Sequence, residues 1–187
     1  MVINCDLLII GGSAGSLEVL LKVLPHLKTD LSFAIVLVFH RKPGMDSLLT
    51  NLLSSKTKIP VKELEEKEKI QNSKIYIVPP NYHLLIEKDK TFSLDASEKV
   101  NYSRPSIDVS FEAASEVYKE NLVAILLSGS NSDGTKGLKK IKENGGITVI
   151  QNPESATVSY MPENARQHVE IDYNLKIEEI ADFINDL

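Results

Sequence analysis

Three residues in this chain could together perform nucleophilic catalysis: Ser13, His40 and Asp133. A serine hydroxyl attacks an ester or amide when a base removes its proton, and histidine is the side chain suited to this near neutral pH. An aspartate completes the set, because it fixes the histidine tautomer and stabilises the imidazolium that forms. These residue types point to acyl transfer if the fold brings them together.

Each of these side chains follows an apolar run typical of a strand buried in a parallel sheet. The carboxyl ends of parallel strands share one edge, and the sites of open α/β sheets lie outside that edge. Because the first two strands of such a sheet are commonly adjacent, His40 is expected beside Ser13, with Asp133 arriving from the other side. The three runs are residues 7–10, 33–39 and 123–127.

The turn around Ser13 is open to three interpretations. Gly11, Ser13 and Gly15 fit the Gly-x-Ser-x-Gly pattern of a nucleophile elbow, a sharp strand-to-helix turn that exposes the hydroxyl. The same turn directs helix N–H groups at any anion nearby, so it could hold a phosphate. A glycine-rich turn can also serve helix packing alone. The turn by itself does not separate these interpretations, and its partners must decide.

Other sites receive less support from the sequence. An α/β-hydrolase orders its triad as Ser13, Asp133 and His168, but His168 follows a polar segment that does not aim it at the sheet edge. Neither dinucleotide-binding nor P-loop spacing is present, and Asp133 would put a carboxylate into the phosphate cradle of residues 129–136. Four histidines and one cysteine show no metal-ligand spacing, so no metal and no cofactor is expected.

Alternating strand-like and helix-like runs predict an α/β fold, a doubly wound, mostly parallel Rossmann-like sheet with helices on both faces. The sequence also predicts a set of short antiparallel strands, a hairpin addition beside the main sheet, at residues 75–78, 83–86 and 91–94. Helices are expected at residues 16–24, 45–53, 105–117, 138–143 and 177–184. Two more strands are expected at 147–150 and 169–171, a solvated connection at 62–69, and a loop with one or two helical turns at 156–167.

Length and composition indicate one globular domain. The chain has 187 residues, 42% of them hydrophobic, and a formal net charge of −5, which argues against binding to nucleic acid or an anionic membrane. No apolar run approaches the roughly 20 residues that cross a bilayer, so we expect no membrane insertion and a cytoplasmic location. The single cysteine, Cys5, is expected to be a core residue.

Seven motifs follow one another along nearly the whole chain: residues 9–15, 39–40, 75–80, 104–108, 127–134, 145–151 and 160–162. Together they resemble the catalytic domain of CheB-type chemotaxis protein-glutamate methylesterases. The resemblance implies a serine hydrolase triad of Ser13, His40 and Asp133. It also implies hydrolysis of γ-methyl glutamate esters on chemoreceptor cytoplasmic helices to glutamate and methanol, with glutamine deamidation as a second activity.

The expected mechanism needs donors for the oxyanion, and four residues at the sheet edge are candidates. Backbone N–H groups near Ala14 and Ser130 are the first of these, with Gly12 and Asn131 beside them. Two alternatives stay open: a non-catalytic module that binds a receptor or ligand on the same fold, and an esterase for small molecules. A protein methylesterase, a binding module and a small-molecule esterase would behave differently when given the same methylated receptor and small esters.

This chain departs from the family pattern at three positions near the serine. Ala14, Ser16 and Ser130 stand where members usually carry threonine, glycine and methionine, and residues 41–44 are more charged than usual. Residues 1–187 are expected to form a single catalytic domain with no receiver domain in this chain. The expected partners are therefore methylated receptor helices and, where regulation comes from another chain, a separate receiver or regulatory protein.

Overall fold

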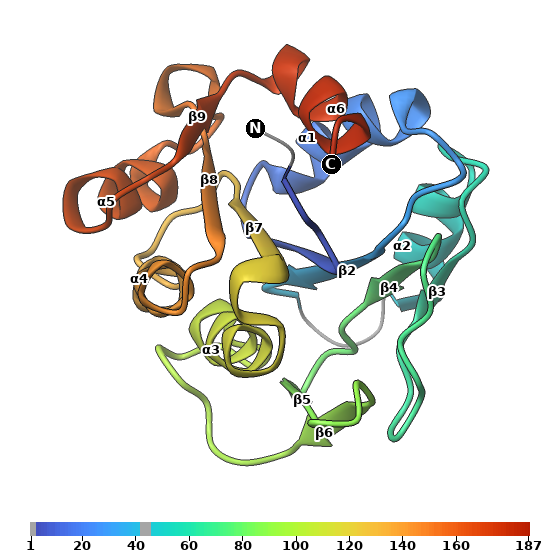
Figure 1. Ribbon diagram of the computed structural model, residues 1–187. Helices are drawn as coiled ribbons and strands as arrows, with labels where there is room; N and C mark the ends of the chain where they lie inside the picture. The colour runs from blue at the N-terminus through green and yellow to red at the C-terminus, as the bar shows by residue number, and fades with distance from the viewer. Residues whose placement is uncertain (1–2, 42–45) are drawn as a thin grey trace.

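The centre of the structure is a sheet of parallel strands (Figure 1), seen in a computed structural model that describes residues 3–41 and 46–187. Within those residues, seven strands pair side by side, all in parallel. Their order across the sheet is β3 (Val61–Glu63), β4 (Ile75–Ile77), β2 (Ala34–Phe39), β1 (Leu7–Gly12), β7 (Leu122–Leu126), β8 (Ile147–Gln151) and β9 (Tyr173–Leu175).

The central strand β1 is buried along its whole length and divides the core into two layers. Leu8 and Ile10 belong to the hydrophobic cluster on one face of the sheet, whereas Leu7 and Ile9 belong to the cluster on the other. This alternation follows from the two-residue repeat of a strand, whose successive side chains point to opposite faces. A strand whose side chains are apolar on both faces of the sheet is buried between two layers of helices.

Helices cover both faces of the sheet (Figure 1). The cluster around Leu8 contains side chains of α1, α2 and α6, and the cluster around Ile9 contains side chains of α3, α4 and α5. The helices are α1 (Ser16–Val23), α2 (Asp46–Ser54), α3 (Ile107–Tyr118), α4 (Thr135–Glu143), α5 (Tyr160–His168) and α6 (Ile177–Asn185). Short 3₁₀ turns occupy η1 (Leu24–His26), η2 (Lys119–Asn121) and η3 (Pro153–Ser155).

The strand order reverses direction beside β1. From β1 the chain passes to β2 and on to β3 and β4 on one side, and then returns to form β7, β8 and β9 on the other side. In open α/β sheets this reversal leaves a crevice outside the carboxyl ends of the two diverging strands, where ligands bind. The segments after β1, β2 and β7 therefore meet at one edge of the sheet.

A separate antiparallel hairpin, β5 (His83–Ile86) and β6 (Phe92–Asp95), lies next to α3. Its apolar residues join the core layer of α3, and the ring of Phe92 meets the ring of Tyr76 edge-on at 4.9 Å between centroids. This hairpin leads into the loop of residues 96–104, which approaches the same edge of the sheet.

The predicted fold class is confirmed, with both helical layers and the antiparallel hairpin. Three local predictions were wrong. Strand β4 pairs in parallel with β2, so it belongs to the main sheet and only β5 and β6 form the hairpin. The edge strand β3 extends into the predicted connection at 62–69, and its half-buried residues lack an apolar pattern. The last strand is β9, not residues 169–171. The helical turns predicted within 156–167 form α5.

The remaining helices and strands agree with the predictions within a few residues. Helix α4 begins at Thr135, three residues before the predicted start, because Gly134 adopts a φ of +92° that turns the chain into the helix. Met45, the first residue of the second predicted helix, lies outside the described residues.

Candidate active site

The turn after β1 places Ser13 at the carboxyl edge of the sheet. The Ser13 N–H donates to the Ser128 carbonyl after β7 at 2.9 Å, and the Ser13 carbonyl accepts the Ser16 hydroxyl at 2.5 Å. Gly15 has a φ of +85°, a conformation that glycine adopts at little cost. Two polar contacts and a left-handed glycine thus fix the chain on both sides of the serine, as the elbow pattern predicts.

The end of β2 lies directly beside this turn. Gly12 pairs with Phe39 in the parallel register, and the His40 N–H donates to the Gly12 carbonyl at 3.4 Å. Ser13 and His40 are therefore the next residues on two hydrogen-bonded strands, as the sequence predicts.

His40 is bound to the third predicted residue. Its Nε2 lies 2.6 Å from Oδ2 of Asp133. The side chain of His40 is 12% exposed, whereas that of Asp133 is wholly buried. An N–H donated from Nε2 to the carboxylate leaves Nδ1 as the nitrogen that can take a proton, which is the tautomer a general base needs.

The carboxylate of Asp133 sits at the N-terminus of α3. It accepts the backbone N–H of Ile107 at 2.7 Å and of Asp108 at 3.0 Å, and the Ser106 hydroxyl at 3.0 Å. The Gly134 N–H adds a further bond at 3.1 Å. The first N–H groups of a helix have no partner within the helix and carry a partial positive charge, so they stabilise an anion there.

These contacts decide the ionisation of Asp133. Burial by itself raises the pKa of the Asp133 carboxyl, but the hydrogen bonds from His40, Asp108 and Ile107 outweigh it, so the pKa lies below its ordinary value. The carboxylate therefore stays charged at neutral pH and can stabilise a protonated His40.

A second buried carboxylate lies next to Asp133. Asp108 accepts the Gly137 N–H at 2.9 Å and the Asn101 side-chain amide at 3.1 Å. Burial, together with the negative charge of Asp133, raises the pKa of Asp108 to about 6, although the hydrogen bond from the Gly137 N–H lowers it in part. Asp108 thus joins the N-termini of α3 and α4 to the loop that contains Asn101.

The structure brings His40 and Asp133 together and places Ser13 at the adjacent strand end. Within the described residues, no hydrogen bond joins Ser13 to the His40 ring. The direct contact between the serine hydroxyl and His40 therefore stays a prediction.

Of the four predicted oxyanion residues, Gly12 ends β1, Ala14 lies in the turn after it, and Ser130 and Asn131 lie in the loop after β7. Ala14 and Ser130 are exposed, and the backbone N–H of neither forms a hydrogen bond within the described residues. Asn131 instead uses its side-chain oxygen to accept the Asp133 N–H at 3.1 Å, and Gly12 uses its carbonyl for His40. Donation from these N–H groups to an oxyanion stays a prediction.

Sequence reasoning missed three residues that hold this arrangement. Ser128 donates its hydroxyl to the Ala14 carbonyl at 2.7 Å, which fixes the elbow against the loop after β7. Ser106 and Asp108 begin α3 around Asp133. Ser106 could have been found, because a serine that directly follows a proline and precedes a helix is a typical N-cap. Ser16 stands where the family usually has glycine. Its hydroxyl donates to the Ser13 carbonyl and so adds a hydrogen bond within the turn.

The remaining sulfur and histidine side chains lie outside this arrangement. Cys5 is buried, and burial raises the pKa of its thiol to about 12, which keeps it protonated. The His168 ring contacts the carbonyl of Asn164 on α5 and does not contact Asp133, which argues against the α/β-hydrolase order. His83 is buried between the Ser106 N–H and the Glu98 carbonyl, both backbone groups.

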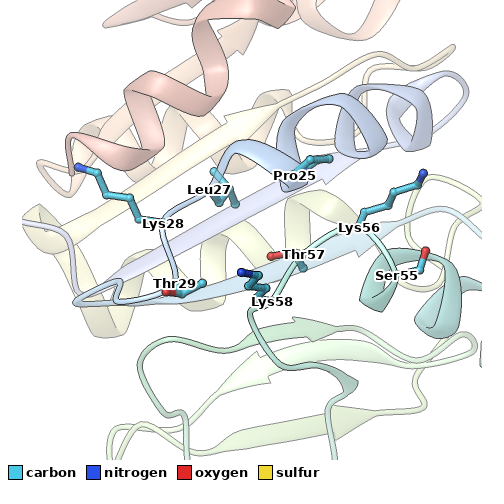
Figure 2. A pocket seen from close by; sticks show the side chains of 8 residues that line it. All are labelled: Pro25, Leu27, Lys28, Thr29, Ser55, Lys56, Thr57 and Lys58. Carbon is cyan, nitrogen blue, oxygen red and sulfur yellow. The ribbon is translucent and has the colours of Figure 1, made fainter.

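Two of the cavities lie at opposite edges of the sheet. One of about 320 Å³ has His40 in its wall, together with the loop of residues 96–104. A larger cavity of about 490 Å³, shown in Figure 2, includes Leu27, Thr29 and Lys58. These residues precede β2 and β3, so the larger cavity lies at the amino edge, away from Ser13. Of these two cavities, the one beside His40 lies at the edge of the sheet that carries Ser13.

The described part of the chain shows neither a metal cluster nor a membrane span. It contains no group of three or more His, Cys, Asp or Glu side chains arranged to hold a metal ion. Over the same residues, no helix has the length and apolar character that a membrane span requires.

Together, the fold and this arrangement define a class of protein: a doubly wound α/β domain with a serine elbow beside a histidine that is bound to a buried aspartate. Comparison with known proteins gives the particular family. Residues 8–184 match the family model described as CheB methylesterase, and the chain belongs to that family.

Curated relatives and a solved structure agree with this assignment. The chain is 49% identical over 179 residues to a putative protein-glutamate methylesterase/protein-glutamine glutaminase of Leptospira interrogans, covering 96% of this chain and 93% of that protein. It is 33% identical to the Thermotoga maritima protein-glutamate methylesterase/protein-glutamine glutaminase, over 99% of this chain and 55% of the relative. The crystal structure of the Thermotoga maritima CheB methylesterase catalytic domain superposes with a TM-score of 0.93 at 32% identity, covering 98% of this chain and 99% of that one.

Proposed function

We propose that this chain is a protein-glutamate methylesterase that uses Ser13 as nucleophile, His40 as general base and acid, and Asp133 as the residue that orients His40. The observation that carries the proposal is the 2.6 Å contact between His40 Nε2 and Asp133 Oδ2 at the strand end next to the serine elbow. Membership of the CheB methylesterase family and the names of its relatives support the choice of substrate.

The reaction proceeds in two acyl-transfer steps. Ser13 Oγ attacks the carbonyl carbon of a γ-methyl glutamate ester while its proton passes to Nδ1 of His40. The tetrahedral intermediate collapses, the bond to the methoxy oxygen breaks, and His40 gives its proton to that oxygen, so methanol leaves. Water then attacks the acyl-enzyme, with its proton taken by His40 and returned to Ser13 Oγ. The products are a glutamate side chain, methanol and the free enzyme.

The electrostatics around His40 fit this sequence of proton transfers. Each step makes His40 an imidazolium for a moment, and the buried carboxylate of Asp133 stabilises that charge. The carboxylate itself keeps its charge because three N–H groups and one hydroxyl hold it. The negative charge on the substrate oxygen would be met by the N–H groups of Ala14 and Ser130.

A glutamine side chain could follow the same route with ammonia as the leaving group. The relatives from Leptospira interrogans and Thermotoga maritima carry glutaminase in their names as well as methylesterase. Because the acyl-enzyme formed from a glutamine is identical to that from the methyl ester, one nucleophile would serve both activities. The substrate we propose is a chemoreceptor cytoplasmic helix.

Methanol release from a receptor helix fragment methylated with labelled methyl groups tests the proposal. We expect release by the wild type and a loss of about 10⁴-fold or more for Ser13→Ala. Ser55→Ala removes an exposed hydroxyl after α2, at the opposite edge of the sheet, and should leave the rate unchanged. Equal rates for the wild type and Ser13→Ala would contradict the assignment.

The same preparation separates the two alternatives. Binding of the receptor fragment without methanol release from wild type would favour a non-catalytic module. Hydrolysis across a panel of small esters, with no release from the receptor fragment, would favour a small-molecule esterase.

A further inference from the structure

The cavity beside His40 differs in charge from the rest of the molecule. The chain has 26 acidic and 21 basic residues, yet no acidic residue lines this cavity and three of the seven lining residues are basic. A concave surface lined by one sign of charge concentrates ligands of the opposite sign. The lining residues are His40, Arg41, Asn81, Lys99, Tyr102, Ser103 and Arg104.

The basic side chains are not equivalent. Arg41 forms an ion pair with Glu63 and donates to the Val78 carbonyl, so its charge is largely balanced. Arg104 donates through Nη1 to two backbone carbonyl groups, which carry no net charge. Lys99 is exposed and forms no ion pair within the described residues. Lys99 therefore carries a positive charge at the mouth of the cavity with no ion pair, and Arg104 adds a second positive charge that the nearby Asp95 partly offsets.

The tip of the loop presents an aromatic ring. Val100 and Ser103 exchange two backbone hydrogen bonds, at 3.2 and 2.9 Å, which close a two-residue turn of Asn101 and Tyr102. Both turn residues have positive φ, 51° and 63°, and Tyr102 is 98% exposed. The left-handed conformation costs a residue other than glycine about 1 kcal/mol or more, so tyrosine is an unfavourable choice for a turn that does nothing else.

Several contacts hold this loop in place although its residues are mostly exposed. The Asn101 amide donates to Asp108 at 3.1 Å, and Asp108 donates its backbone N–H to Asp133. His83 lies 2.9 Å from the Glu98 carbonyl. The loop is thus attached to the buried carboxylate that neighbours Asp133. A surface fixed in this way binds a partner without first losing conformational freedom.

We infer that this loop and cavity bind the acidic stretch of polypeptide that flanks the methylated glutamate, with Lys99 and Arg104 contacting its carboxylates and Tyr102 packing on its apolar side chains. The inference rests on the proposed function and names how that site selects its substrate. A methyl ester is neutral, so a preference for acidic substrates must come from groups outside the reacting residue.

Two synthetic peptides with one γ-methyl glutamate ester each test the inference. One carries glutamates around the ester, and the other carries glutamines at the same positions. We expect the wild type to show a kcat/KM about 10-fold higher for the acidic peptide. In Lys99→Glu this preference should disappear or reverse. Lys56→Glu makes the same change of charge at an exposed position after α2, near the cavity at the opposite edge of the sheet, and should keep the wild-type preference.

Direct binding distinguishes a failure of this inference from a failure of the proposed function. Fluorescence anisotropy of the labelled peptides does not depend on turnover, so it reports the preference even if neither peptide releases methanol. Tighter binding of the acidic peptide to the wild type, weakened in Lys99→Glu and by added salt, supports the surface. The same ratio in the wild type and in Lys99→Glu, by either readout, would overturn it. Tyr102→Ala should weaken binding of both peptides about 5-fold or more.

Discussion

His40 Nε2 lies 2.6 Å from Asp133 Oδ2, although 93 residues separate the two in the chain. The pair forms because β2 and β7 end on either side of β1, and the loop after each strand turns back over the same edge. Backbone N–H groups at the N-terminus of α3 donate to the Asp133 carboxylate and hold it in place. A histidine oriented in this way, next to a serine elbow, is the arrangement on which the proposed mechanism depends.

Replacement of Asp133 by asparagine should reduce kcat for methanol release by about 10⁴-fold. If the asparagine oxygen takes the place of Oδ1, which accepts the Asp108 N–H, its NH₂ group faces His40 Nε2, and that nitrogen must then be the acceptor. The proton moves to Nδ1, which can no longer take the proton of Ser13. Steady-state assays on methylated receptor fragment check this, with Asp30→Asn as the exposed control. A loss of less than 10-fold would argue against this role of Asp133.

Asp108 provides a pH-dependent prediction about stability. Its pKa is raised to about 6 in the folded protein, so the folded state holds that proton more tightly than the unfolded chain. The stability that the protonated carboxyl contributes is present at low pH and is lost as the pH rises through about 6. The amide introduced by Asp108→Asn has no such proton, so relative to wild type the variant should gain about 2 kcal/mol of unfolding free energy between pH 4 and pH 8.

Urea unfolding of both proteins across that pH range measures the difference. The comparison cancels the contributions of other carboxyl groups that the two proteins share. A difference between Asp108→Asn and wild type that does not change with pH would show that Asp108 titrates normally.

The elbow glycine gives a prediction with a matched control. Gly15 and Gly145 have nearly the same φ, +85° and +86°, so alanine costs about 1–2 kcal/mol of backbone strain at either position. A Cβ at Gly15 would also lie 2.7 Å from the Ser128 hydroxyl and 2.9 Å from Thr157, whereas at Gly145 the nearest atom is 3.7 Å away. We expect Gly15→Ala to be the less stable variant by chemical denaturation, and the one that loses methylesterase activity.

Equal losses of stability in the two alanine variants would mean that the contacts around the elbow adjust freely. In that case Gly15 would be needed only for the backbone conformation of the turn, and the close packing of Ser128 against the elbow would contribute little to stability.

The sequence was sufficient for the central strands β1, β2 and β7 and for the placement of His40 near Asp133, because the apolar runs and the polar residues that end them are local signals. The hydrogen bonds that hold Asp133 could not be predicted from the sequence. Its partners at Ile107 and Asp108 are backbone N–H groups, which nearly every residue type offers, so no pattern of side chains marks them. The edge strands β3 and β9 were missed or misplaced because their half-buried or exposed residues lack an apolar repeat.

The position of the loop that lines the cavity beside His40 could not be predicted from the sequence either. Residues 96–104 read as an ordinary polar stretch, and only the fold shows that Lys99 and Tyr102 line the same cavity as His40. Proximity of this kind depends on how the hairpin of β5 and β6 packs against α3, which is a property of the tertiary structure.

The most direct test of the central claim is covalent labelling of Ser13 by a serine-directed fluorophosphonate, followed by mass spectrometry of the peptide that contains it. The phosphonate reacts with a serine whose proton is removed by a base, so labelling reports activation without any receptor substrate. We predict a single adduct on Ser13 in the wild type and a labelling rate at least about 100-fold lower in His40→Gln. Equal labelling of the wild type and His40→Gln, or no adduct on Ser13 in the wild type, would contradict the claim that His40 activates this serine.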